Sequence, residues 1–404
     1  MQQQVLLLSP KVADPKMIIS KYLASPRAAI MAVFAAFGAI VGVFSGSVPQ
    51  MMVGANLTNT SYGLAITLMT ATTVASMGVT GALAVRFSHR ALLLVLLPLA
   101  WTAYAGMLTS GSLLEFSILA AFSGIILGIL DVIMNAEGGA IEVDLKRPIY
   151  TTFHGSVSLS LAGFAIISSI LSTEIGTWAS ICTASIPVIT AMVLVYKFLP
   201  SRPLPVRNLD RNDARHFTKP LILIGIAAGL IIACEICALF WSSKLLADTA
   251  PQLAAISGIG AAFFGLCNAS LRFFGDRLRT RFSEKKIMIS TLTLAIVGFG
   301  GLGVTTGFAA NVFFFAVTGF GLSLLCPCLY SMSSRETPKN RAAGLSISML
   351  VAGVPRIIAP TAFGAMAQNF STSAAFGACA LVLAVAMLVV MNLGSHTKSM
   401  QIAQ

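Results

Sequence analysis

The sequence predicts an all-α membrane protein in which twelve transmembrane helices form two six-helix bundles with pseudo-twofold symmetry. Three observations support this fold class. Apolar segments of about 20 residues, the length that crosses the hydrocarbon core of a bilayer, recur along the chain. Lys and Arg gather in alternate gaps between these segments, and the two halves of the chain share a motif.

Composition agrees with a membrane protein. Hydrophobic residues make up 56% of the chain, charged residues only 10%, and the mean hydropathy is +0.87. A soluble domain carries about 25% charged residues. The net charge of +12 is compatible with nucleic-acid binding, but the basic residues occupy short gaps beside apolar segments rather than one amphipathic face. We therefore expect a lipid bilayer as the surroundings and no nucleic-acid partner.

Six predicted spans precede a long polar gap, and six follow it. The first six are 28–53, 61–85, 91–109, 113–141, 149–172 and 176–199. The last six are 220–246, 252–275, 286–307, 309–332, 342–367 and 372–394. The gap is Pro-rich and charged, which is typical of a linker. The expected organisation is therefore a tail at 1–27, a bundle at 28–199, a linker at 200–219, a bundle at 220–394 and a tail at 395–404.

The basic residues predict the orientation of the chain. All of the 26 Lys and Arg residues except Lys244 and Arg356 fall on one side of the predicted topology. Cytoplasmic loops carry an excess of Lys and Arg. The sequence therefore predicts a multi-pass protein of the bacterial inner membrane with both termini in the cytoplasm.

An internal repeat relates the two halves. Arg86-Phe87-Ser88-His89-Arg90 follows the second span, and Arg281-Phe282-Ser283-Glu284-Lys285 follows the eighth, 195 residues later. A repeat of six helices predicts two bundles related by an axis along the membrane normal. In such an arrangement, a solute site lies between the bundles near the middle of the membrane.

The loop after each repeated pair of helices resembles the signature of the major facilitator superfamily, roughly G-x-x-x-D-R-x-G-R-[RK]. The second copy reads RFFGDRL at 272–278, whereas the first copy, at 81–90, has Val85 where Asp is usual. This resemblance covers the whole chain and implies the fold of that superfamily, a monomer, and transport by alternating access. It also implies that Asp276 and Arg277 stabilise one conformation through cytoplasmic contacts without touching substrate.

A narrower resemblance is to the MosC-like branch, which is related to fucose permeases. It rests on the fourth span with the residues that follow it up to His154, and on the seventh span. The matching residues are Asp131, Met134, Asn135, Glu137, Glu142, Arg147, Pro148, Phe153, His154, Glu235, Trp241 and Ser242. Phe240 stands where that branch commonly has Asp, and Ser47 stands where many relatives have Arg. These two departures suggest a substrate pocket that has diverged.

Glu235 is the first candidate site residue. An ionisable group inside the bilayer costs at least about 2.5–3.5 kcal/mol, so each one invites a functional interpretation. Glu235 lies near the middle of the seventh span with no Lys or Arg within one turn. Burial favours its neutral form, so it is a candidate for proton coupling and substrate binding. The alternative is a permanently protonated side chain that only donates a hydrogen bond across the bundle.

A polar stripe on the fourth span supplies further candidates. Asp131, Asn135 and Glu142 are spaced so that they share one helix face, which is typical of a lining along an aqueous path. We expect Asp131 and Asn135 to bind substrate and Asp131 to take part in proton coupling. We expect Glu142, Arg147 and His154 to form a gate at the cytoplasmic mouth. The alternative is that the whole stripe is a structural network.

Arg356 and Trp241 complete the predicted site. Arg356 lies in the middle of the eleventh span beside Pro355 and four residues before Pro360. Prolines free backbone carbonyls where a helix borders a cavity. Arg356 is a candidate to bind an anionic group of the substrate, or else to neutralise Glu235 or an acid of the fourth span. Trp241 is a candidate to stack on a substrate ring, although interface anchoring is the alternative.

These features predict a secondary active transporter that moves a small polar solute (sugar-like, inositol-like or an organic anion) together with protons. One alternative is an exporter of drugs or toxic compounds, and a remote one is a membrane receptor that does not transport. The Gly-rich runs have no Walker-type Lys after them, which argues against an ATP-driven pump. The sequence contains no nucleophile–base or metal-ligand constellation, so we expect neither an enzyme nor a cofactor or metal.

Overall fold

The computed structural model describes residues 25–146, 149–201, 217–337 and 341–393. Within these ranges all regular secondary structure is helical. Eleven described helical spans are long and apolar enough to cross a membrane, one of them, Phe308–Glu336, made of two consecutive helices, and the segment Ile259–Gly275 forms a shorter apolar helix. The all-α membrane fold predicted from the hydropathy pattern is confirmed.

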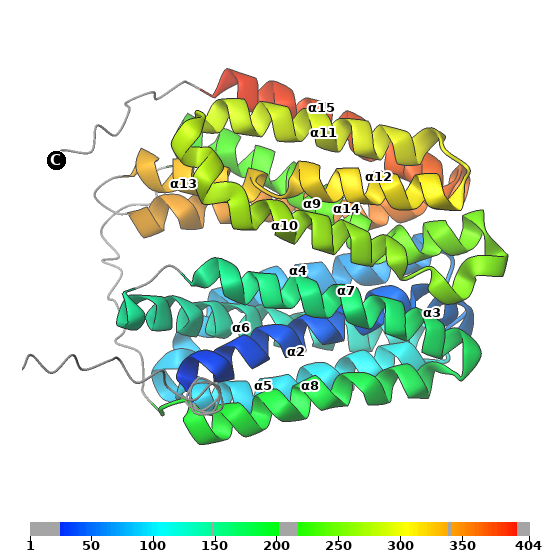
Figure 1. Cartoon of the computed structure of the whole chain (residues 1–404), viewed down its shortest axis with the longest axis horizontal. Helices are drawn as coiled ribbons and strands as arrows, with labels where there is room; N and C mark the ends of the chain where they lie inside the picture. Colours follow the sequence, from blue (N-terminus) through cyan, green and yellow to red (C-terminus); the bar gives the residue numbers. More distant parts are fainter. Residues whose placement is uncertain (1–24, 147–148, 202–216, 338–340, 394–404) are drawn as a thin grey trace, which may run out of the picture.

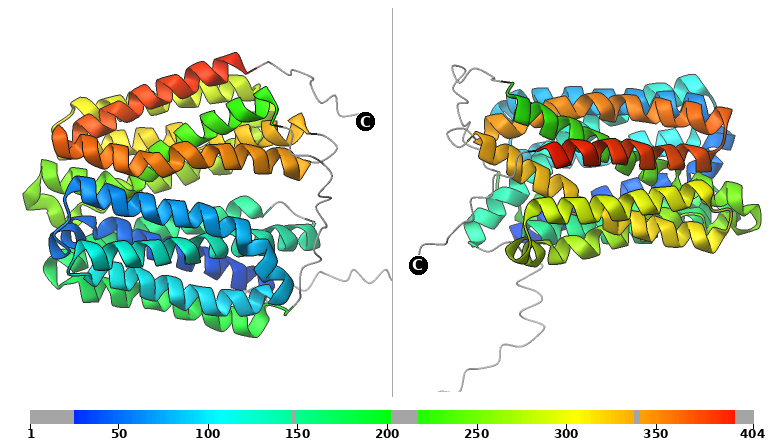
Figure 2. Two further views of the ribbon diagram at one scale, coloured as in Figure 1. Left: turned by 180° about the vertical axis from the view of Figure 1, so that it is seen from behind. Right: turned by 90° about the horizontal axis from the view of Figure 1, so that it is seen from above.

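The helices form two groups. The first contains α2 (Pro26–Gly46), α3 (Val48–Gly54), α4 (Asn59–Arg86), α5 (His89–Thr109), α6 (Leu113–Leu145), α7 (Tyr150–Glu174) and α8 (Thr177–Phe198). The second contains α9 (Lys219–Thr249), η1 (Pro251–Ile256), α10 (Ile259–Arg281), α11 (Glu284–Val304), α12 (Phe308–Leu322), α13 (Leu325–Glu336), α14 (Arg341–Asn369) and α15 (Thr372–Asn392). The two groups form two layers whose helices run along the long axis of the molecule (Figure 1), as the other views also show (Figure 2).

Two names describe the ends of this assembly. We call the end at which α2 begins and α15 ends the termini end, and the opposite end the distal end (Figure 1). The linker predicted at 200–219 connects the two groups at the termini end, although most of it lies outside the described residues. The predicted tail at 395–404 and nearly all of the tail at 1–27 also lie outside them.

Hydroxyl caps set the beginnings of several helices. Six of the described helices start directly after a Ser or Thr whose hydroxyl accepts a backbone N–H of the first turn: α2, α4, α5, α6, α11 and α15. Ser88 and Ser283, which occupy equivalent positions in the repeated motif, cap α5 and α11 in this way. The repeat therefore encodes the same helix start in both halves.

Glycines bring α2 and α7 into backbone contact. Gly38, Gly42 and Gly46 share one face of α2, and a Cβ atom added to them would lie 2.3, 2.5 and 2.2 Å from backbone carbonyl oxygens of α7. Small residues at this spacing let membrane helices approach closely, so dispersion contacts replace the hydrophobic effect that lipid does not supply. Close backbone contact therefore holds α2 and α7 together within the first group.

The eighth predicted span is displaced along the chain. The expectation was a helix over 252–275, but Pro251 begins the short 3₁₀ helix η1 and α10 runs from Ile259 to Arg281. A hydropathy window placed the span too early because the last three turns of α10 carry several cations. As a consequence, Arg272, which is close to the end of the predicted span, lies more than two turns inside α10.

The tenth predicted span is broken. The expectation was one helix over 309–332, but the structure contains α12 and α13 with a break at Ser323 and Leu324. Pro327, in the first turn of α13, has no N–H to donate to the carbonyl of Ser323, four residues earlier. The first predicted span is likewise divided, into α2 and α3 at Ser47.

The two groups meet at the distal end through α4 and α14. The backbone N–H of Asn59 donates to Oε1 of Gln368 at 3.0 Å, and the hydroxyls of Thr67 and Thr361 lie 2.7 Å apart. Between these bonds the backbones touch: a Cβ added to Gly63 would lie 2.4 Å from the carbonyl oxygen of Pro360. We call this α4–α14 interface the distal contact.

Candidate functional site

Polar side chains gather between the two groups, at the middle of their helices and towards the termini end. We call them the central cluster: Asp131 and Asn135 on α6, Tyr150 and His154 on α7, Glu235 on α9, Asn268 and Arg272 on α10, Tyr330 on α13 and Arg356 on α14. Charges across the cluster lie within electrostatic range of one another. Arg356 acts on Asp131, Arg272 acts on His154, and Tyr330 is influenced by Arg356, Glu235 and Asp131.

The first group supplies a chain of hydrogen bonds. The amide of Asn135 donates to Oδ1 of Asp131 at 2.9 Å, as their spacing of one helix turn predicts. The hydroxyl of Tyr150 donates to Oδ1 of Asn135 at 2.5 Å. Tyr150 therefore fixes which end of the amide faces Asp131. Sequence reasoning missed Tyr150, whose position one turn before His154 was the available signal.

Glu235 has a cationic neighbour that the sequence did not suggest. Its Oε1 lies 3.5 Å from Nη2 of Arg272 and 3.5 Å from the amide nitrogen of Asn268. The absence of Lys and Arg within one turn of the same helix holds, but it does not leave Glu235 without a cation, because Arg272 comes from α10. From the sequence, Arg356 was a candidate to neutralise Glu235, whereas Arg272 was not considered for this role.

Arg272 also donates a hydrogen bond to the carbonyl group that is left without a helical partner at the break in the tenth span. Its Nε donates to the carbonyl oxygen of Ser323 at 3.0 Å, which is the carbonyl that Pro327 leaves without a helical partner. The side chains of Arg272 and Glu235 are 27% and 21% exposed, so solvent screens their attraction only partly. One guanidinium thus joins α9, α10 and the break between α12 and α13.

Arg356 has no comparable partner. Within the described part of the chain, its Nε is buried without a hydrogen-bond acceptor, and no carboxylate lies within ion-pair distance of its guanidinium. The helix α14 passes through Pro355 and Pro360 without a break. Its charge acts on Asp131, an acid of the fourth span, which was one of the two alternatives. Arg356 retains hydrogen-bonding capacity for a further anionic group.

The predicted gate residues have different surroundings. Oε2 of Glu142 accepts the backbone N–H groups of Ile149 at 2.8 Å and Tyr150 at 2.7 Å, so Glu142 caps the start of α7. Arg147 lies outside the described residues. His154 belongs to the central cluster, with its ring 5.0 Å from that of Tyr150.

The residues carried over from the loop signature lie at the end of α10. The structure places Asp276 and Arg277 in the last turns of this helix, about one turn beyond Arg272 and towards the termini end. Arg277 is exposed there. Their assignment to conformational contacts remains a prediction.

The cap made by Glu142 predicts a loss of stability on mutation. Hydrogen bonds to a charged group contribute about 1.5–3 kcal/mol, so we expect Glu142→Ala to lower the melting temperature of the purified chain. Glu142→Gln should be less harmful, since an amide oxygen still accepts these bonds. Asp144→Ala, which removes an exposed acid two residues away, is the matched control. Equal melting temperatures for Glu142→Ala and Asp144→Ala would contradict the capping role.

Trp241 lies outside the central cluster. It is completely buried, and its ring packs 4.8 Å from Tyr62 and 4.9 Å from Phe363, measured between ring centroids. The hydroxyl of Tyr62 donates to the carbonyl of Phe240 at 3.1 Å. In this conformation Trp241 is therefore part of the closure at the distal end, and its stacking on a solute remains a prediction.

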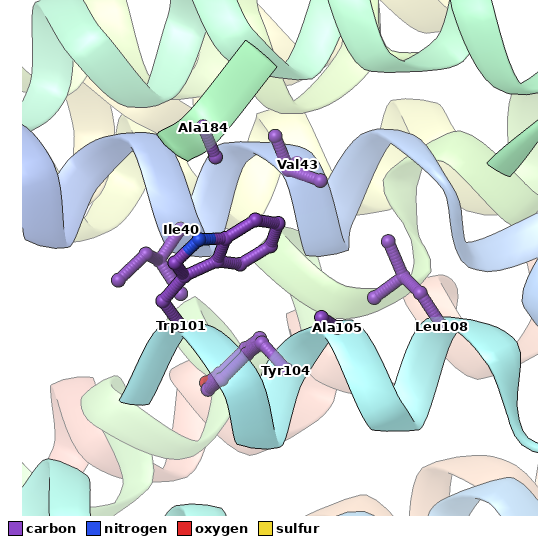
Figure 3. Close-up of a pocket in the computed structure, with 7 residues that line it drawn as sticks. All are labelled: Ile40, Val43, Trp101, Tyr104, Ala105, Leu108 and Ala184. Atoms are coloured by element: carbon purple, nitrogen blue, oxygen red, sulfur yellow. The ribbon is translucent and has the colours of Figure 1, made fainter. Parts of the chain in front are cut away.

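A small apolar crevice between α2, α5 and α8 is a poor candidate for a solute site. Figure 3 shows the residues that line it: Ile40, Val43, Trp101, Tyr104, Ala105, Leu108 and Ala184. None of these side chains carries a charge, and Tyr104 directs its hydroxyl to the sulfur of Met69 at 3.9 Å. The central cluster is therefore the stronger candidate for recognition of a polar molecule.

Comparisons with known proteins agree with this architecture. Residues 239–401 match the family model described as Major Facilitator Superfamily. An uncharacterised MFS-type transporter of Yersinia pestis is 24% identical over 348 residues, covering 83% of this chain and 87% of that protein. Membrane protein MosC of Rhizobium meliloti is 20% identical over 334 residues, covering 82% of this chain and 81% of MosC.

A solved structure matches over nearly the whole length. The inward open conformation of the xylose transporter XylE from E. coli superposes with a TM-score of 0.72 at 16% identity. The match covers 93% of this chain and 97% of that chain. At this identity the likeness concerns the fold, and it extends over both helix groups.

Proposed function

Because the chain belongs to the major facilitator superfamily, we propose that it is a secondary active transporter for a small polar solute, driven by protons. The observation that carries the proposal is the central cluster. It places two carboxylates and two guanidiniums between the helix groups, in a protein otherwise poor in charge. Intramembrane ionisable groups mark solute and proton pathways.

The conformation of the chain supports alternating access. We place the termini end in the cytoplasm, because nearly all Lys and Arg residues lie on that side of the topology. The distal contact then closes the outer side. On this assignment the chain faces inward, as does the XylE structure that it resembles.

The two acids suit proton coupling. Oε1 of Glu235 lies 3.5 Å from Nη2 of Arg272, and Asp131 is within electrostatic range of Arg356, so each acid has a cationic neighbour. Protonation of an acid removes that attraction and releases the cation for other partners. In our proposal Asp131 and Glu235 exchange protons, and Arg356 binds an anionic or strongly polar group of the solute.

The remaining side chains favour a hydroxylated or anionic solute. Asn135, Asn268, Tyr150 and Tyr330 supply hydrogen-bond donors and acceptors in the central cluster. These groups suit a sugar, an inositol or a hydroxy acid. An exporter of lipophilic cations would gain nothing from the unpaired Arg356, so this alternative has no supporting observation.

A two-step experiment tests the proposal. First, the purified chain is screened by thermal stabilisation against sugars, inositols, nucleosides, carboxylates and lipophilic cations, since a ligand that binds the folded state raises the melting temperature. Second, uptake of the stabilising compound into proteoliposomes is measured with and without a pH gradient. Stabilisation by lipophilic cations alone would contradict the assignment of a polar solute.

Glu235→Gln should separate binding from coupling. We expect this variant to exchange solute across the membrane but to lose accumulation driven by a pH gradient, because the amide cannot take up a proton. Asp248→Asn, at the distal end and paired with Lys244, is the control and should retain accumulation. If Glu235→Gln accumulates solute with the pH dependence of the unmodified chain, Glu235 is not the coupling acid.

A further inference from the structure

The break in the tenth span is held by a residue from another helix. Pro327 frees the carbonyl of Ser323, and Nε of Arg272 donates to it at 3.0 Å. The helices touch at this point, because a Cβ added to Gly275 would lie 2.7 Å from Cδ2 of Leu324. The carbonyl that Pro327 frees at the break is therefore bonded by the side chain of Arg272.

The same guanidinium faces Glu235. Its Nη2 lies 3.5 Å from Oε1 of Glu235, while its Nε remains on Ser323. Guanidinium is planar and rigid, so its donors cannot move independently of one another. A change in the attraction at one edge therefore alters the hydrogen bond at the other.

We propose that Arg272 is a positioning residue that transmits the charge of Glu235 to the break between α12 and α13. This inference rests on the proposed function, because the role that it gives to Arg272 is to couple protonation of Glu235 to movement of α13. An ionised Glu235 holds Arg272 in place, and Arg272 holds the carbonyl of Ser323. A neutral Glu235 no longer attracts the guanidinium, so the first turn of α13 loosens.

Other groups around the pair determine where the guanidinium moves. His154 on α7 and Cys326 on α13 lie within electrostatic range of Arg272, and Tyr330 on α13 lies within range of Glu235. Asp131 on α6 and Arg356 on α14 reach the same Tyr330. By the sign of their charges, Arg356 repels a released Arg272, whereas Asp131 attracts it. Movement towards α6 would transfer the change to the other helix group.

The far end of α13 is held independently. Arg279 of α10 bonds to Ser331 at 2.9 Å and to Glu284 at 2.7 Å, and Arg335 of α13 also pairs with Glu284. Loosening at Ser323 therefore lets α13 pivot about its fixed end. This movement would shift Tyr330, which lies in the central cluster.

Hydrogen exchange of the full-length chain in lipid nanodiscs tests the proposal without a substrate or a gradient. At one fixed pD, we compare amide exchange of residues 324–329 in the unmodified chain, Glu235→Gln, Arg272→Gln and the double variant. We expect each single change to speed exchange by about threefold to tenfold, and the double variant to show no further increase, because both act through one contact.

A matched control uses the arginine two turns further along the same helix. Arg279→Gln removes an ion-paired arginine from α10 that does not contact Glu235. In this background Glu235→Gln should still speed exchange at the break, so the two effects should add. Arg272→Lys should restore part of the protection, because it keeps the charge but not the fork that reaches Ser323.

Two results would overturn the proposal: unchanged exchange at 324–329 in Glu235→Gln, or independent effects of Glu235→Gln and Arg272→Gln. The measurement on Glu235→Gln keeps Arg272 unmodified, so it tests the proposal even if Arg272→Gln does not fold. The proposed function fails separately, if Glu235→Gln still accumulates solute. If the effects of Glu235→Gln and Arg272→Gln on exchange do not add, but Glu235→Gln still accumulates solute, then Arg272 does connect Glu235 to the break. In that case the connection does not serve proton coupling.

Discussion

Gly63→Leu should abolish transport while leaving the chain folded. A Cβ at this position would lie 2.4 Å from the carbonyl oxygen of Pro360, and backbone atoms cannot move aside as a flexible side chain can. The clash exists only when α4 and α14 meet at the distal contact. If overpacking costs about 3 kcal/mol, the equilibrium shifts against the closed state by about 100-fold.

The opposite side of the contact gives a second variant. A Cβ added to Gly364 would lie 2.3 Å from the carbonyl oxygen of Asn59, so Gly364→Leu should have the same effect. Gly78→Leu is the matched control on α4, because no described atom lies within 4 Å of its Cβ position. It should transport normally.

Labelling would show which state the variants occupy. Phe363 is 5% exposed beside Trp241, so a cysteine there is protected when the distal end is closed. Measured in a Cys182→Ser background, Phe363→Cys should react with a membrane-impermeant maleimide faster in Gly63→Leu than with Gly63 intact. Normal transport by Gly63→Leu, or equal labelling rates, would contradict closure through this contact.

Arg356→Ala should weaken solute binding by about 100-fold to 1,000-fold. Truncating one partner of a buried, hydrogen-bonded charge pair costs about 2–5 kcal/mol. Arg356 is the one arginine of the described central cluster without a hydrogen bond or ion pair, so its donors remain free for a solute. Arg356→Lys should recover only part of the affinity, since it lacks the planar fork.

The alternative role of Arg356 is to neutralise Asp131, and a double variant separates the two roles. If Arg356 serves only as a counter-ion, Asp131→Asn should restore binding to Arg356→Ala, because neither charge is then left alone. If Arg356 binds the solute, binding stays weak in the double variant. Arg281→Ala, which removes an exposed cation at the end of α10, is the control and should bind normally.

The fold could be predicted because it follows from local properties of the chain. Apolar length and the distribution of Lys and Arg report on the bilayer directly, and the caps at Ser88 and Ser283 are encoded in the repeat. The bond between Asn135 and Asp131 was also predictable, because it lies within one helix turn. Local spacing is sufficient for features of this kind.

The rest of the site depends on contacts between helices, which spacing does not reveal. Arg272 lies inside the predicted span 252–275, but its contact with Glu235 joins two different helices and leaves no signal in the spacing of either one. Trp241 was placed in the site because it lies two turns from Glu235, although a rotation of the helix directs it to Tyr62. Pro327 was a visible signal for the break, but its partner comes from a different helix.

The chemical make-up of the distal contact has a consequence for its reversibility. Its described contacts include hydroxyls, an amide, backbone groups and glycines, beside the apolar rings around Trp241. When the contact separates, water can replace each hydrogen bond, so the polar part costs little net free energy. Water therefore enters the interface when it opens and leaves it when it closes. The burial of the aromatic rings determines how strongly the closed state is favoured over the open one.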